Sequence, residues 1–272
     1  MTIKITVLLE NRRRGARLLA KPGLSLLVED GEKRILFDTG PDDSAARNAA
    51  QMNIDLASVD AVVLSHGHYD HCGGIDSLPA GMTVICHPAI ADERHAALPL
   101  PGGGLRIKKL SRNVNYARHK TVCTRAPLPV SAATLWSGEI AVDSPKAYGL
   151  LNPRGNKPDY IIDEGVLIHR SRRGLIIITG CGHRGLINIV KHCQKITGVD
   201  RIYAVIGGFH LRSASPLAIV KIRRFLKAQH TELIIGCHCT GLWGQLWLAG
   251  PGARTLKTGD VIRLGEDELT PE

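Results

Sequence analysis

Hydrophobic residues along this chain fall into short runs of strand length, each followed by a turn or by a helix signal. In the N-terminal part the runs at residues 3–9, 24–29 and 34–37 predict a β-meander, with Asp30 and Gly31 as a hairpin turn. An alanine-rich helix is expected over residues 43–53, with Asp42 or Asp43 as its N-cap. This half of the chain therefore predicts a sheet with a helix against it.

The C-terminal half repeats a strand, turn and helix pattern. The run LIIIT at residues 175–179 pairs as a hairpin with residues 166–169, and its successive apolar residues are typical of a strand buried on both faces. A helix at residues 186–196 follows it directly. The pattern recurs in a strand, helix and strand at residues 201–206, 216–229 and 233–235, with closing strands in 254–264. We predict an α/β fold and a single domain over residues 1–272.

Two stretches lack a clear period. Residues 98–129 and 145–158 are rich in proline, glycine and basic side chains. Loops of this length in a compact domain are often functional. We expect a lid or a substrate-facing insertion around residues 98–158.

The stretch LSHGHYDHCGG, residues 64–74, carries the densest candidate chemistry. It places His66, His68, Asp70 and His71 within six positions, directly after an apolar run. Imidazole nitrogens and a carboxylate suit zinc, with iron(II) or manganese as alternatives, and the spacing fits a loop better than one helical face. His66 and His68 would share one metal ion, while Asp70 and His71 hold a second. A polar surface loop and hydrogen-bonded core histidines are the alternatives, and the density of ligands disfavours both.

The spacing HxHxDH resembles the signature of the metallo-β-lactamase superfamily. That resemblance implies an αββα sandwich of two mixed β-sheets flanked by helices, with the metal site at one edge. It implies His183 as a further ligand of the first metal and His238 of the second. It also gives Asp38, in the segment LFDTG, the role of orienting a ligand histidine.

Three later stretches narrow the resemblance. TGCGHRGLINIV, IGGFHL and CHCTG are similar to the branch that includes the archaeal dihydropterin–aminobenzene phosphate synthase. Hydrolases of the superfamily usually carry a bridging aspartate where this chain has Gly207-Gly208-Phe209-His210. We therefore weigh His210 as a ligand, a substrate contact or a catalytic acid or base, with one or two divalent ions. We interpret Cys181, Cys237 and Cys239 as small buried residues that line the strand ends.

Composition and net charge indicate the cellular compartment and the kind of partner. The formal net charge is +10, and 44% of the residues are hydrophobic. No uninterrupted apolar run reaches a membrane span, no secretory signal is recognisable, and the seven scattered cysteines are typical of reduced thiols, so we expect a cytoplasmic protein without membrane attachment. The positive charge favours an anionic partner. With 4% aromatic residues, a small phosphorylated molecule is expected before nucleic acid.

These features predict a metal-dependent hydrolase that activates water on a small anionic substrate. Asp70 and His210 are the expected catalytic residues, and Arg184 and Lys157 the expected substrate contacts. Three alternatives remain open: a synthase-like condensation with diphosphate release, a nucleic-acid phosphodiesterase, and a metal-binding module without turnover.

Overall fold

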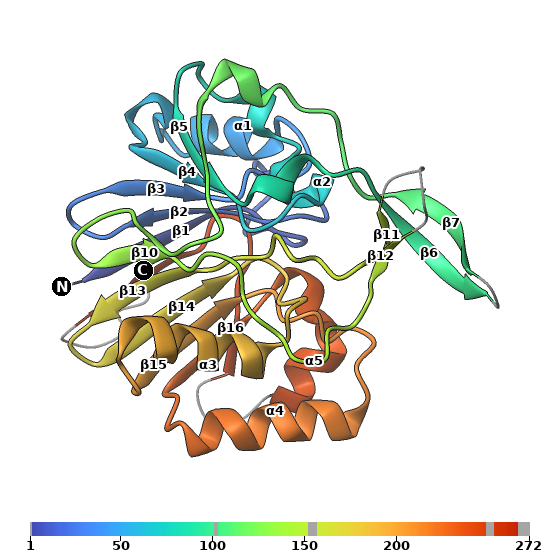
Figure 1. The fold of residues 1–272 in the computed structure, drawn as a ribbon. Helices are drawn as coiled ribbons and strands as arrows, with labels where there is room; N and C mark the ends of the chain where they lie inside the picture. The colour runs from blue at the N-terminus through green and yellow to red at the C-terminus, as the bar shows by residue number, and fades with distance from the viewer. Residues whose placement is uncertain (1, 101–102, 152–156, 249–252, 266–272) are drawn as a thin grey trace.

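Two seven-stranded sheets pack face to face in the computed structural model, which describes residues 2–100, 103–151, 157–248 and 253–265 (Figure 1). Part of the expected insertion, residues 101–102 and 152–156, lies outside these ranges. The first sheet contains the N-terminal meander. Its strands, in spatial order, are β18 (Val261–Leu264), β1 (Ile3–Leu9), β2 (Ser25–Glu29), β3 (Arg34–Phe37), β4 (Ala61–Val63), β5 (Thr83–Cys86) and β8 (Lys120–Cys123).

The second sheet is also mixed. Strands β14 to β17 run parallel, and the hairpin of β13 and β14 is antiparallel, as the sequence predicted. Every residue of β14 is buried, in agreement with the apolar run LIIIT. The spatial order is β17 (Ala253–Thr255), β16 (Leu233–Gly236), β15 (Ile202–Gly207), β14 (Gly174–Thr179), β13 (Leu167–Ser171), β10 (Thr134–Trp136) and β9 (Leu128–Pro129).

The segment expected to be irregular contains a third sheet. Its four strands are β12 (Lys157–Asp159), β11 (Gly149–Leu151), β6 (Arg94–Leu100) and β7 (Gly103–Lys109). Strands β6 and β7 form a hairpin that projects from the two main sheets (Figure 1). The sequence of this hairpin shows no sustained alternation of apolar and polar residues. Leu98, Leu105 and Ile107 are exposed, so no buried face imposes a period of two.

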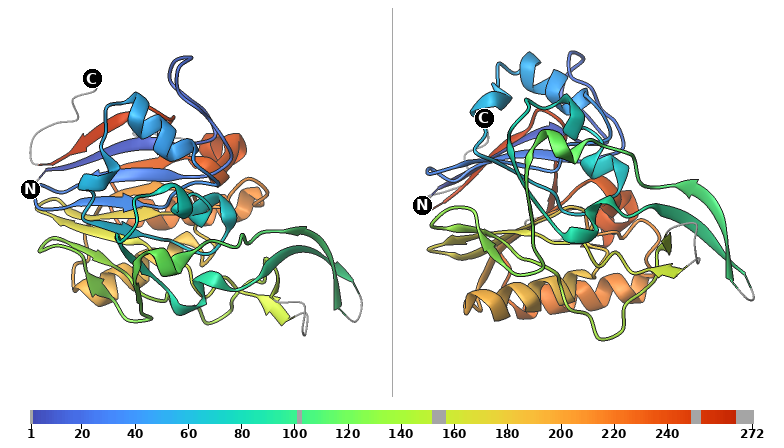
Figure 2. Two further views of the ribbon diagram at one scale, coloured as in Figure 1. Left: turned by 90° about the horizontal axis from the view of Figure 1, so that it is seen from above. Right: turned by 45° about the horizontal axis from the view of Figure 1, so that its top comes forward.

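Helices cover the outer faces of both main sheets (Figures 1 and 2). Helix α1 (Ser44–Gln51) lies on the first sheet, and α3 (Leu186–Thr197) and α4 (Pro216–Ala228) lie on the second. Ser215 caps α4 by accepting a hydrogen bond from the Ala218 amide. The shorter helices are α2 (Tyr69–Cys72), α5 (Gly241–Leu248), η1 (Leu56–Ser58), η2 (Ile75–Ser77), η3 (Pro88–Ala91), η4 (Tyr116–Arg118) and η5 (His238–Thr240).

Three apolar clusters account for these layers. One fills the space between the two sheets, and the other two lie between each sheet and its helices. The predicted αββα sandwich is thereby confirmed. No helix in the described part of the chain is both long and apolar enough to cross a membrane.

Candidate metal centre

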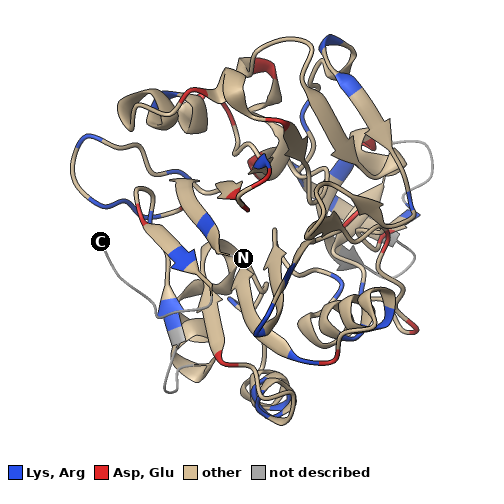
Figure 3. Ribbon diagram, turned by 90° about the vertical axis from the view of Figure 1, so that its left-hand side faces the viewer, with Lys and Arg blue, Asp and Glu red and all other residues tan. Residues whose placement is uncertain are grey.

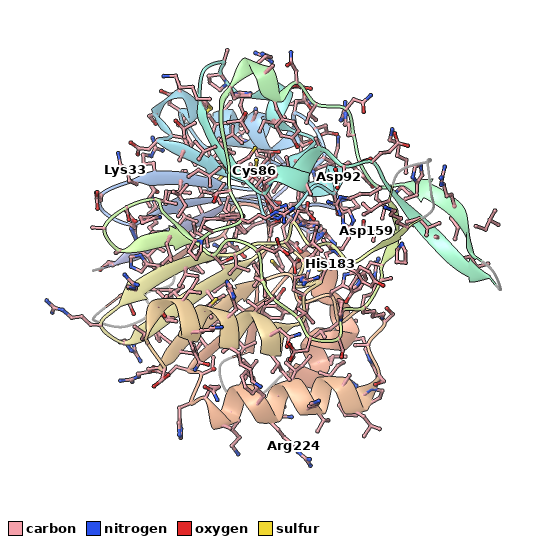
Figure 4. The ribbon with its side chains drawn as sticks, viewed as in Figure 1. Lys33, Cys86, Asp92, Asp159, His183 and Arg224 are labelled. Atoms are coloured by element: carbon pink, nitrogen blue, oxygen red, sulfur yellow. The ribbon has the colours of Figure 1, made fainter. Side chains whose placement is uncertain are left out.

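Carboxyl ends of strands from both sheets meet at one edge of the sandwich. Because β3 and β4 run parallel, as do β14, β15 and β16, the segments that follow them emerge on the same side. His66, His183, His210 and His238 all lie in such segments. Figure 4 shows His183 at this edge, between the two sheets.

His66, His68 and His183 form the first group of imidazoles. His66 Nε2 lies 3.0 Å from His68 Nδ1, and the His183 ring centroid lies 5.1 Å from that of His66 and 5.0 Å from that of His68. All three side chains are buried. His68 Nε2 and both ring nitrogens of His183 lack a hydrogen-bond partner.

Asp70, His71 and His238 form the second group. The Nε2 atoms of His71 and His238 are 3.2 Å apart. Asp70 Oδ2 lies 3.9 Å from His71 Nε2 and 3.5 Å from His238 Nε2. The structure thus brings together the six side chains that the sequence assigned to two metal ions.

Each of three histidines is anchored through its Nδ1 atom, which directs Nε2 toward the centre. His66 Nδ1 is 2.8 Å from Ser65 Oγ, His71 Nδ1 is 2.7 Å from Asp38 Oδ2, and His238 Nδ1 is 3.0 Å from Asn11 Oδ1. Asp38 also accepts hydrogen bonds from the amide and the hydroxyl of Ser65. Its position agrees with the orienting role that the sequence suggested.

Two buried carboxylates hold the backbone of the other ligand segments. Glu164 accepts hydrogen bonds from the amides of His183 and Arg184, at 2.8 and 2.7 Å. Glu10 accepts one from the amide of His238, at 2.7 Å. Burial raises the pKa of Glu164 to about 7. Neither residue was singled out in the sequence, because an isolated acidic residue next to a strand carries no periodic signal.

Burial dominates the protonation of the first group. It lowers the pKa values of His66 and His183 well below their ordinary value, and that of His68 to about 3. Burial would also lower the pKa of His71, but the carboxylates of Asp38 and Asp70 together outweigh it and raise the pKa to about 9. The first group therefore presents neutral imidazoles, which is the form that binds metal.

The arrangement fits a divalent cation. Buried ring nitrogens of His68 and His183 have no hydrogen-bond partner, and they stay unsatisfied unless a further group binds them. Two sets of atoms lie within 4.8 Å of one another, His66 with Cys181 and His183, and His71 with Cys181 and His238. Nitrogen, sulfur and carboxylate donors in this number can hold a divalent metal ion.

His210 and Cys239 lie beside the first group. The His210 ring centroid is 4.4 Å from that of His183, and its backbone amide donates to Cys239 Sγ at 3.3 Å. His210 and Cys239 form a further candidate group with Cys181. The backbone φ of His210 is 49°, a left-handed value that is uncommon outside glycine and clusters at functional sites.

The expected insertion contributes an aromatic residue that the sequence did not indicate. The ring of Tyr148 packs edge-on against His183, at 4.6 Å between centroids, and against His210, at 4.9 Å. Burial raises the pKa of Tyr148 to about 12, so the phenol keeps its proton. Tyr148 and Lys146 line a pocket of about 140 Å³ beside His183.

A second pocket, of about 300 Å³, lies beside His238. Its walls include Arg12 and Arg212 together with Asn11 and the start of α5. The two pockets thus border different ligand groups, and each has basic side chains in its lining.

The two residues expected to contact substrate lie in different surroundings. Arg184 lines the pocket beside His183, but its guanidinium donates to the carbonyls of Ile140 and Tyr160. Lys157 is exposed on β12 and does not line either pocket. A substrate contact by either residue stays a prediction.

Comparisons with known proteins agree with this geometry. The family model described as metallo-β-lactamase superfamily matches residues 19–186. The chain belongs to the metallo-β-lactamase superfamily. Over 237 residues it is 33% identical to the 7,8-dihydropterin-6-methyl-4-(β-D-ribofuranosyl)-aminobenzene-5'-phosphate synthase of Methanocaldococcus jannaschii, covering 80% of this chain and 81% of the relative. The branch indicated by the sequence is therefore confirmed.

Solved structures of the superfamily share the fold. Tm1679, described as a metal-dependent hydrolase of the β-lactamase superfamily, superposes with a TM-score of 0.83 at 27% identity, over 97% of this chain and 100% of its own. The short form of human tRNase Z has a TM-score of 0.53 at 12% identity, over 95% and 98% of the two chains. The second likeness concerns the fold alone.

Proposed function

We propose that this protein is a metal-dependent enzyme that acts on a small phosphorylated substrate, with hydrolysis as the leading reaction. The observation that carries the proposal is the meeting of two ligand groups at one edge of the sandwich, with unsatisfied ring nitrogens in the first. Metal ions bound there would satisfy these nitrogens, and the adjoining pockets supply space for a substrate.

His66, His68 and His183 would hold one ion, and Asp70, His71 and His238 the other. When bound, a divalent ion polarises a phosphoryl oxygen and lowers the pKa of a coordinated water from about 16 toward about 7. The protein's own residues supply orientation. Ser65, Asp38 and Asn11 fix the ring orientations of three ligands.

Side chains around the pocket beside His183 support an anionic substrate. Lys146 and the N-terminus of α3 lie at this pocket, and both favour negative charge. Tyr148, which keeps its proton, can donate a hydrogen bond to a substrate oxygen. In this proposal His210, whose ring lies next to that of His183, would exchange a proton with the reacting group, and Asp70 would help to hold the second ion.

A condensation with diphosphate release is the second candidate. The relative from Methanocaldococcus jannaschii is named a synthase, and a two-substrate reaction needs room for two molecules. The pockets beside His183 and His238 offer such room on two sides of the centre. In this reaction a nucleophile from the second substrate would replace water.

Nucleic acid is a weaker candidate. On the side that faces the viewer in Figure 3, Lys and Arg are distributed over strands, helices and loops and do not form one continuous stripe. Binding of RNA or DNA that weakens steeply with salt would favour the phosphodiesterase alternative.

The test compares activities of zinc-, iron(II)- and manganese-loaded protein on phosphomonoester, phosphodiester and pterin diphosphate substrates. We expect turnover of a small phosphorylated compound that is lost with chelator and restored by metal. A pterin diphosphate consumed only when an aminobenzene co-substrate is present would select the condensation. Retention of every activity by a His68→Ala protein that has lost its metal would contradict both.

A further inference from the structure

The position that usually supplies a bridging carboxylate cannot do so in this chain. A Cβ atom built on Gly207 would lie 2.0 Å from the carbonyl oxygen of Thr179. One built on Gly208 would lie 2.3 Å from the carbonyl oxygen of Gly180 and 2.7 Å from Cys239 Sγ. Neither position accepts a side chain without a shift of backbone, so these two positions cannot supply a protein ligand that two ions share.

Cys181 occupies the space between the two ligand groups. Its Sγ atom lies 3.1 Å from His71 Nε2, which belongs to the second group. The same sulfur lies within 4.8 Å of a ring nitrogen of both His66 and His183, which belong to the first. Among the described residues, Cys181 is the member common to every candidate metal group.

The surroundings of Cys181 point to a ligand instead of ordinary core packing. The residue is 4% exposed, and the adjacent His183 is 6% exposed with both ring nitrogens unpartnered. Gly180 and Gly182 flank it, and Gly182 has a φ of 74°, which lets the turn present the side chain to the centre.

We propose that the Cys181 thiolate is the ligand shared by the two metal ions, in place of the bridging carboxylate. The inference rests on the proposed metal centre. On metal binding the S–H bond breaks, the proton passes to the buffer, and sulfur lone pairs are donated to the two ions without any redox change. A zinc–sulfur bond is about 2.3 Å long. Because Cys181 Sγ lies close to ring nitrogens of both groups, it would be within bonding reach of an ion held by either group.

Cys239 is the matched control. Its Sγ atom donates to the carbonyl oxygen of Cys181 at 3.3 Å and accepts from the amide of His210 at 3.3 Å. It belongs to the group of Cys181 and His210 but to neither of the two histidine-rich groups. Loss of the metal–thiolate signal in a Cys181 variant, but not in a Cys239 variant, would therefore assign the ligand to Cys181.

The experiment is a titration of metal-free full-length protein with Co²⁺ under anaerobic conditions, read by the near-ultraviolet thiolate-to-cobalt charge-transfer band. We expect the band in the wild type and in Cys239→Ser, growing through about two equivalents of cobalt. Cys181→Ser and Cys181→Ala are expected to lose it. The wild-type spectrum shows whether any thiolate binds the metal, and the variants assign that thiolate to Cys181 or to Cys239.

Three outcomes would overturn the inference: bound cobalt without the band in the wild type, a band that survives in Cys181→Ser, or a band that saturates at about one equivalent. In each of these cobalt is still bound, so the proposed metal centre would stand. Failure of the folded wild type to bind cobalt or zinc at all would overturn the proposed function together with the shared thiolate.

Discussion

The carboxylate of Asp38 accepts a hydrogen bond from Nδ1 of His71 at 2.7 Å, and neither side chain is exposed to solvent. Asp38 adopts a left-handed φ of 59°, a conformation that costs free energy for most residues. The pair directs His71 Nε2 toward His238 and makes the ring a more basic ligand.

Replacing Asp38 with asparagine should therefore weaken metal binding. Asparagine tolerates the left-handed backbone but removes the negative charge, so we expect zinc affinity to fall about 10- to 100-fold. Competition with a chromophoric chelator measures the change. Asp43→Asn, at an exposed carboxylate before α1, should bind zinc like the wild type. Equal affinities in the two variants would contradict the orienting role.

A buried arginine ties the third sheet to the metal loop. Arg94, on β6, is 2.8 Å from Asp159 on β12 and 2.9 Å from Asp163, and Asp163 accepts a hydrogen bond from the amide of Gly67. Figure 4 shows Asp159 near this edge of the sandwich. The ion pairs connect the segment that carries Tyr148 with the loop between His66 and His68.

Arg94→Met should leave two buried carboxylates without their cation. We expect the free energy of unfolding to fall by about 3–5 kcal/mol, measured by urea denaturation with chelator present. Arg47→Met, at an exposed position of α1, is the control and should change stability by less than about 0.5 kcal/mol. A loss below about 1 kcal/mol in Arg94→Met would show that these ion pairs do not stabilise the fold.

Asp30 links the two main sheets at the β2–β3 turn. It accepts hydrogen bonds from the hydroxyls of Ser131 and Thr134 and from the amides of Glu32 and Lys33. Burial acts to raise the pKa of Asp30, but these hydrogen bonds outweigh it and hold the pKa below the ordinary 3.8. Because the folded pKa is depressed, the stabilisation is complete above pH 3.8 and is lost as pH falls through the folded value.

Asp30→Asn should therefore destabilise the protein by about 2 kcal/mol at pH 6, and by less at pH 3. Urea unfolding at the two pH values, with chelator throughout, gives the difference. Asp200→Asn, at an exposed carboxylate, should match the wild type at both. A deficit in Asp30→Asn that grows toward low pH would reverse the assigned direction of the pKa shift.

The sequence predicted the two sheets and the ligand loop because both leave local signals. The apolar run LIIIT is long enough to mark a buried strand, and HxHxDH concentrates ligands within one loop. His183 and His238 were assigned from a resemblance, and their position at parallel strand ends explains why they meet.

Residues whose roles depend on contacts between distant segments leave no local signal in the sequence. Cys181 was interpreted as packing, because its approach to His71 depends on how β14 and the metal loop come together across the sandwich. The guanidinium of Arg184 donates hydrogen bonds to the carbonyls of Ile140 and Tyr160. The sequence around Arg184 gives no indication of these partners, because both lie far away along the chain. The sequence did not predict the hairpin of β6 and β7, because strands without a buried face need no alternation of apolar and polar residues.

Metal content tests the central claim most directly. Purified wild type, His68→Ala and His87→Ala would be compared by elemental analysis after incubation with zinc and removal of excess ion. His87 is a buried control, hydrogen-bonded to the Ala89 amide and paired with Glu139. We predict about two ions per chain in the wild type and His87→Ala, and about one or fewer in His68→Ala. Folded wild type without bound zinc, or a full complement in His68→Ala, would contradict the assignment of this edge as a metal centre.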